Sequence, residues 1–325
     1  MKKESLNVPE EQGSSLWKDA FLRLSRNSAA MCSLLALVLI VASCFLVPLL
    51  PWLPHPNVQD LSRIAEAPSW DHWFGTDQLG RDLLARVLYG GRISLLVGVV
   101  ATGVSLVIGV AYGLVSGYAG GRLDALMMRL VDVLFALPFI VLVIIFSLSV
   151  EDPSRQLTQW ISDITGWSVE MVSPITGLIP LFIAIGALGW LTLARIVRTQ
   201  TLELKGREFV EAARSLGLGH VKILFRHIAP NLFGSVIVYT TLAVPGIMLL
   251  EAVLSFLGLG VKAPNSSWGT LIKEGADRME VSPELLLFPA LLFSVTLLAI
   301  MLTLFGFNLF GDGLRDALDP KSSKD

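Results

Sequence analysis

The chain has 325 residues, of which 53% are hydrophobic and 16% are charged, and its formal net charge is −2. A soluble domain carries about 25% charged residues, so the composition predicts a membrane protein, and the nearly balanced charge gives no indication of a nucleic-acid partner. Because about 20 apolar residues cross a lipid bilayer, we predict an all-α polytopic protein with six transmembrane helices. Six runs of 18 or more residues without Asp, Glu, Lys, Arg or His carry this prediction: 27–54, 93–121, 133–150, 171–194, 228–250 and 285–311.

The N-terminal segment 1–28 is mostly polar and is predicted to be cytoplasmic. Leu16, Trp17, Ala20, Phe21 and Leu24 recur in it at helical spacing, which favours a short helix on the inner membrane surface over a frayed tail.

The first transmembrane helix is predicted at 29–50, and prolines at its end begin an external loop at 51–91. Within this loop the pairs Asp77/Arg81 and Asp82/Arg86 are four residues apart and are expected to pair on a helix surface, with Thr76 or Asp77 as its N-cap.

Residues 92–310 are predicted to form a core of five further transmembrane helices. Its second span carries Ser105, Gly109, Gly113 and Gly117 on one face, which predicts close approach of another helix. Pro138 is expected to kink the third span, and 151–177 is predicted to be an extended external loop.

The segment 195–231 is predicted to be a cytoplasmic loop, because it contains seven Lys or Arg between two apolar runs. With the N-terminus inside, the inner segments hold 17 Lys or Arg and the outer loops hold 8. The positive-inside rule therefore predicts that both termini, including the tail 311–325, are cytoplasmic.

Two short amphipathic helices are predicted within this loop. Phe209, Ala212, Ala213 and Leu216 form one apolar stripe, and Val221, Leu224, Phe225 and Ile228 form a second. Gly217 is expected to form the turn between them, and Pro230 to bar continuation into the next span. The residues alone leave two alternatives equal: the stripes dock a partner, or they pack on the chain's own spans.

A possible pathway site lies in the fifth span, where Pro245 and Gly246 precede Glu251. Glu251 is expected about 30 Å along this helix, at the outer boundary of the hydrocarbon core. An intramembrane carboxylate is a functional candidate, whereas at the boundary a solvated or hydrogen-bonded structural carboxylate is the alternative.

No enzyme site is predicted. The chain contains no Gly-Lys pair and so no P-loop, no His-Glu-x-x-His motif and no Gly-x-Ser-x-Gly motif. We therefore expect no catalytic, cofactor or metal site in this chain.

One motif carries a resemblance. Glu211-Ala212-Ala213 is followed by Gly217 six residues after the Glu and by Pro230 nineteen after it. This pattern resembles the EAA loop of ABC-transporter permeases, although Ala229 stands where Leu is frequent. Gly75-Thr76-Asp77, Ser267-Trp268-Gly269 and the segment 311–320 are similar to the C-type subunit of the peptide and nickel import family.

The resemblance implies a type I importer (MetI-like) fold in a bacterial inner membrane. It implies a second, homologous permease subunit, two cytoplasmic ABC ATPases that use ATP and Mg²⁺, and an external substrate-binding protein. Oligopeptides or dipeptides are the expected substrates, with nickel or glutathione as alternatives. An ion-coupled secondary transporter and a membrane-embedded hydrolase are rival interpretations. The implied ATPase-coupling residues are Phe209, Glu211, Ala212, Ala213, Leu216, Gly217, Val221, Leu224, Ile228 and Pro230.

Overall fold

The computed structural model describes residues 28–318, which form helices and, within that range, no strand. Five of the helices are long and apolar enough to cross a membrane, or six if the bent pair α4 and α5 counts as one span. This confirms the predicted all-α polytopic fold; the predicted surface helix before residue 28 and the end of the C-terminal tail lie outside the described residues. The elements are α2 (Ser28–Leu46), η1 (Val47–Leu49), α3 (Leu83–Ala119), α4 (Gly121–Ala136), α5 (Phe139–Thr165), α6 (Val169–Thr176), α7 (Ile179–Lys205), α8 (Glu208–Ser215), α9 (His220–Ile223), the π-helical turn η2 (Leu224–Ile228), α10 (Ala229–Phe256), α11 (Trp268–Ala276) and α12 (Glu284–Leu318).

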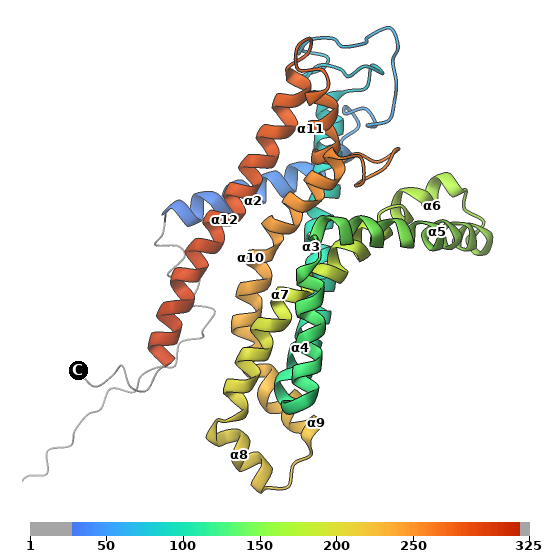
Figure 1. Ribbon diagram of the computed structural model, residues 1–325. Helices are drawn as coiled ribbons and strands as arrows, with labels where there is room; N and C mark the ends of the chain where they lie inside the picture. Colours follow the sequence, from blue (N-terminus) through green and yellow to red (C-terminus); the bar gives the residue numbers. More distant parts are fainter. Residues whose placement is uncertain (1–27, 319–325) are drawn as a thin grey trace, which may run out of the picture.

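Helices α3 and α7 pack closely along the centre of the molecule (Figure 1). The small residues predicted on α3 make this approach possible. A Cβ atom on Gly113 would lie 2.6 Å from the carbonyl oxygen of Ala194, and one on Gly117 would lie 2.7 Å from that of Arg198. Ser105 donates a hydrogen bond to the carbonyl of Gly186 at 3.0 Å. The predicted packing role of this face is confirmed.

The third predicted span is broken. α4 ends at Ala136, α5 begins after Pro138, and the two helices are bent by 97°. A proline cannot donate the helical hydrogen bond, and the residue before it avoids the helical region. α5 and α6 leave the bundle sideways (Figure 1). The prediction of a loop at 151–177 is wrong, because α5 continues to Thr165 and α6 covers Val169–Thr176.

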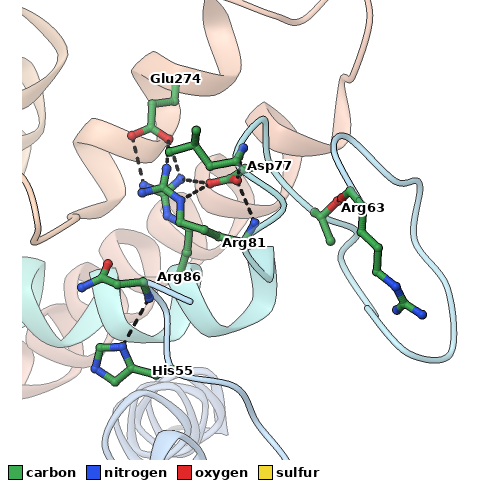
Figure 2. Close-up of polar contacts among 9 residues, drawn as sticks. His55, Arg63, Asp77, Arg81, Arg86 and Glu274 are labelled. Carbon is green, nitrogen blue, oxygen red and sulfur yellow. Dashed lines mark hydrogen bonds and ion pairs between the residues drawn. The ribbon is translucent and has the colours of Figure 1, made fainter. Parts of the chain in front are cut away.

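The first turn of α3 and the segment before it are organised by buried charges (Figure 2). Asp82, rather than Thr76 or Asp77, is the N-cap of α3 and accepts a hydrogen bond from the Ala85 amide at 2.8 Å. Asp77 pairs with Arg81 at 2.6 Å, which confirms the pair; it lies in the turn before α3 with both side chains largely buried, however, and not on a helix surface as predicted. The prediction that Asp82 pairs with Arg86 is wrong. Arg86 instead donates hydrogen bonds to Asp77 at 2.8 Å and to Glu274 of α11 at 2.5 and 3.0 Å.

The fifth span does not begin after a break at Pro230. α9 passes through the π-helical turn η2 directly into α10, so the prediction that Pro230 bars continuation is wrong. Pro230 occupies the first turn of α10. A proline is tolerated there because its missing N–H has no partner to lose, and the wider π turn supplies the transition.

Candidate functional site

The predicted coupling loop forms a compact helix–turn–helix, which we call the coupling segment (residues 208–230). It lies at the end of the molecule opposite α11 (Figure 1). α8 carries Glu208 and Glu211 in its first turn and Arg214 in its last turn, an arrangement that matches the helix dipole. Gly217 has φ +79°, which confirms the expected glycine turn, and the Leu218 amide bonds to the carbonyl of Ala213 at 3.2 Å.

One face of the coupling segment is buried against the chain's own spans. Val210 and Ile223 are fully buried and pack in one cluster with Leu114 of α3 and Val197 of α7. Three residues predicted to couple to an ATPase share this cluster, namely Ala213, Leu224 and Ile228. Their side chains therefore hold the segment on the membrane domain.

The opposite face leaves apolar side chains exposed. The exposed fractions are 81% for Leu216, 71% for Val221, 66% for Phe225 and 39% for Phe209. A shallow groove lies here between α9 and the start of α10, lined by Val221, Phe225 and Pro230 and by the basic residues His220, Lys222 and Arg226. Glu211, Ala212 and Gly217 are also exposed. Each predicted stripe is thus divided: some of its side chains pack on the chain's own spans, the others are exposed, and docking of a partner on the exposed ones stays a prediction.

Polar contacts tie the coupling segment to the spans. The hydroxyl of Tyr118 at the end of α3 lies 2.9 Å from Nδ1 of His220. Lys205, the last residue of α7, donates to the carbonyl of Tyr118 at 2.5 Å. Nearby, Arg198 of α7 pairs with Asp124 of α4 at 2.5 and 2.6 Å. Sequence reasoning missed Tyr118, because a single tyrosine at the end of a span carries no local signal for a partner 102 residues away.

The carboxylate predicted at the outer boundary is wholly buried. Glu251 has no exposed surface; it accepts hydrogen bonds from Ser255 at 2.6 Å and from Ser94 of α3 at 3.2 Å. Ser94 in turn accepts from the Trp268 amide at 3.1 Å, so the cluster joins α3, α10 and α11. Glu251 is thus hydrogen-bonded and not solvated, as expected for a buried carboxylate, which is costly to leave unpaired; its role in the pathway stays a prediction.

The other two pathway candidates are not gathered around Glu251. Pro245 is buried within α10, whereas Gly246 is exposed, with no atom within 4 Å of a Cβ placed on it. Among residues 28–318 no group of three His, Cys, Asp or Glu side chains is placed to hold a metal ion.

Comparisons with known proteins give a consistent result. Residues 109–324 match the family described as "Binding-protein-dependent transport system inner membrane component", and residues 15–68 match the "N-terminal TM domain of oligopeptide transport permease C". The oligopeptide transport system permease protein OppC of Haemophilus influenzae is 46% identical, over 95% of this chain and 90% of the relative. OppC of Bacillus subtilis is 43% identical, over 95% of this chain and 91% of the relative. The dipeptide transport system permease protein DppC of the same organism is 40% identical, over 94% of this chain and 86% of the relative.

Proposed function

Since the chain belongs to the family of binding-protein-dependent transport system inner membrane components, we propose that it is the permease subunit of an ATP-driven peptide importer and forms half of its membrane pathway. The MetI-like permease domain of this family accounts for the all-helical membrane fold. Oligopeptides are the proposed substrates, since OppC proteins of three genera are 43–46% identical to this chain. A glutathione permease is also similar, at 37% identity, and dipeptides or glutathione are the less favoured substrates.

The observation that carries the coupling mechanism is the two-sided coupling segment. Its exposed face, with Phe209, Leu216, Val221 and Phe225, would dock an ABC ATPase. Removing one large apolar side chain fully from water contributes about 1.5–3 kcal/mol, so these side chains would supply part of the docking free energy, set against the cost of association.

Its buried face would transmit the motion of that ATPase. Ile223 and Val210 pack on α3 and α7, and Ile228 packs with Leu232 of α10. Because close-packed interiors move as units rather than deform continuously, a displacement of the segment would be passed to three spans at once. ATP and Mg²⁺ would be used by the partner ATPases, and this chain by itself would hydrolyse no ATP.

The remaining partners follow the organisation of the family: a second, homologous permease subunit, two cytoplasmic ATPases and an external substrate-binding protein. The proposed location is the bacterial inner membrane with both termini inside, supported by the distribution of Lys and Arg. A membrane-impermeant thiol reagent should label a cysteine placed at Gln159 from outside and should not label one at Ser215. The reverse pattern would contradict this orientation.

Uptake in cells tests the proposal. We expect Leu216→Asp combined with Phe225→Asp to abolish ATP-dependent uptake of a labelled oligopeptide, because both charges enter the proposed apolar contact. The single variant Ser215→Asp adds the same charge beside Leu216 and should retain most of the uptake. Membrane levels of all variants should match the native chain, since the three side chains are exposed. Full uptake by the double variant would refute the docking assignment.

A further inference from the structure

Helix α5 carries an exposed apolar stripe along its distal half. Leu157, Trp160 and Ile164, which we call the α5 stripe, recur at i, i+3 and i+7 and are exposed by 36%, 61% and 64%. Towards the start of the helix the same line continues through Phe146, Val150 and Pro153 at steps of three or four residues. The segment Phe139–Val150, from which the line comes, contains no charged residue.

The two other faces of the second half of α5 (residues 151–165, here called distal α5) are polar, one of them buried and the other exposed. Ser154 and Thr158 are buried against α6, where Ser154 donates to the carbonyl of Thr176 at 2.7 Å and the two threonine hydroxyls lie 2.6 Å apart. A third face exposes polar side chains, among them Gln156 and Gln159. The α5 stripe is therefore exposed or partly exposed in the described part of the chain and lies beside a polar face, which is the pattern of a helix at a membrane surface.

The bend at Pro138 fixes the direction of α5. α4 runs beside α7, as the ion pair Asp124–Arg198 at 2.5 Å and the pair Asp132–Arg195 at 2.7 Å require. Because α5 turns by 97° from α4, it cannot follow the direction of the spans and must cross it.

The depth of α5 follows from the helices that it meets. Val143 of α5 shares a buried cluster with Leu178 and Leu181, which lie at the start of α7. The apolar run of this span is 171–194 and the proposed cytoplasmic loop begins at residue 195, so the start of α7 is the outer end of the span. Glu151 of α5 also pairs with Lys262, which follows the outer end of α10. α5 therefore meets the bundle at the outer ends of α7 and α10, near the outer boundary of the membrane.

From this direction, depth and surface we propose that distal α5 lies in the outer lipid interface, with the α5 stripe immersed at the boundary between head groups and acyl chains. Its apolar line is continuous with the surface of Phe139–Val150, which adjoins the lipid-facing spans of this membrane protein. Trp160 and the nearby Trp167, exposed by 61% and 59%, are the side chains that favour such an interface.

Helices α5 and α6, which we call the arm, are tied to the outer end of the helix bundle. Lys262, in the connection between α10 and α11, pairs with Glu151 at 2.7 Å, and Asn265 donates to the carbonyl of Pro174 at 2.6 Å. Lipid contact by the α5 stripe therefore anchors the connection that follows Glu251 and Ser255. The proposal concerns the membrane surface only and stands independently of the transported substrate.

Spin labels in the assembled importer, reconstituted in nanodiscs of phosphatidylethanolamine and phosphatidylglycerol, test this inference. In a background of Cys32→Ser and Cys44→Ala, single labels replace Leu157, Trp160 or Ile164, with Gln156 and Gln159 as matched controls one residue away. We expect the stripe labels to collide several-fold more with oxygen, which partitions into lipid, than with a water-soluble nickel chelate. The control labels should show the opposite preference.

Two outcomes would overturn the inference. If the stripe labels are as accessible to the chelate as the controls, the arm stands in water. If the stripe labels are shielded from both reagents, a protein covers the arm instead of lipid. A change of lipid head group from zwitterionic to anionic should alter the mobility of a label at residue 160 without altering that of a label at residue 221, which lies at the far end of the molecule.

Discussion

The Tyr118 hydroxyl lies 2.9 Å from Nδ1 of His220, so the last turn of α3 contacts the first residue of α9. The backbone carbonyl of Tyr118 also accepts a hydrogen bond from Lys205 at the end of α7. One residue thus connects two spans with the coupling segment. This contact is exposed and is worth only about 0.5–1.5 kcal/mol, so it contributes little to the stability of the fold, and we expect it to align the segment.

Tyr118→Phe should therefore reduce coupling and leave assembly intact. The variant keeps the ring and the backbone contact with Lys205 but loses the hydroxyl that faces His220. We expect a two- to five-fold fall in peptide transported per ATP hydrolysed, measured in proteoliposomes that contain the whole importer. An unchanged ratio would show that the contact has no part in coupling.

Close packing between α3 and α7 gives a second prediction. Gly113→Val should lower the free energy of unfolding by about 1–3 kcal/mol or more, because the new Cβ would lie 2.6 Å from a backbone carbonyl oxygen of α7. Gly103→Val is the matched control on the same helix, since no atom lies within 4 Å of a Cβ there. Thermal unfolding of the purified subunit in detergent distinguishes them; equal midpoints would contradict the packing account.

The buried charge network at the start of α3 gives a third prediction. Asp77 and Arg86 side chains are only 5% and 4% exposed. Arg86→Met removes the guanidinium that bridges Asp77 and Glu274. Asp77 keeps Arg81 as a partner and the Glu274 side chain is 48% exposed, so we expect a loss of about 1.5–3 kcal/mol, as for hydrogen bonds to charged groups. Arg63→Met is the control: Arg63 pairs with Asp71 at 3.4 Å, both side chains are exposed by 40% and 73%, and such pairs contribute about 0–1 kcal/mol. Comparable stability of the two variants by chemical denaturation would argue against the network.

Glu251 gives the fourth prediction. Glu251→Gln keeps the size of the side chain and one carbonyl acceptor for Ser94 or Ser255, so the complex should assemble at native levels. It removes the carboxylate that joins α3, α10 and α11 through these serines, and we expect impaired peptide uptake. Uptake is to be compared at equal amounts of assembled complex. Normal uptake would assign Glu251 a purely structural role.

Features that depend on local sequence were predictable. The four-residue spacing of Gly109, Gly113 and Gly117 predicted the α3–α7 contact, because small residues on one face leave room for a neighbouring helix. The glycine turn at Gly217 followed from the interruption of two amphipathic patterns.

Features that depend on distant partners were not predictable from the sequence. The four-residue spacing predicted that Arg86 pairs with Asp82. In the structure Arg86 instead donates a hydrogen bond to Glu274, which is 188 residues away. The helical continuation of α5 beyond residue 150 was missed because charged and polar residues interrupt its apolar pattern, and α6 was missed because it was divided between the expected loop and the following apolar run. Apolar periodicity also marked both stripes of the coupling segment correctly, but it carries no information on which side chains face the chain's own spans and which remain exposed.

The measurement that tests the central claim most directly is site-specific photo-cross-linking in the purified importer. A photoreactive amino acid at Leu216 or Phe225, both exposed, should form a covalent adduct with an ATPase subunit. The same amino acid at Leu123, an exposed position on α4, should form no such adduct. If Leu216 and Phe225 give no ATPase adduct while the ATPases remain bound to the complex, the coupling segment is not their docking site.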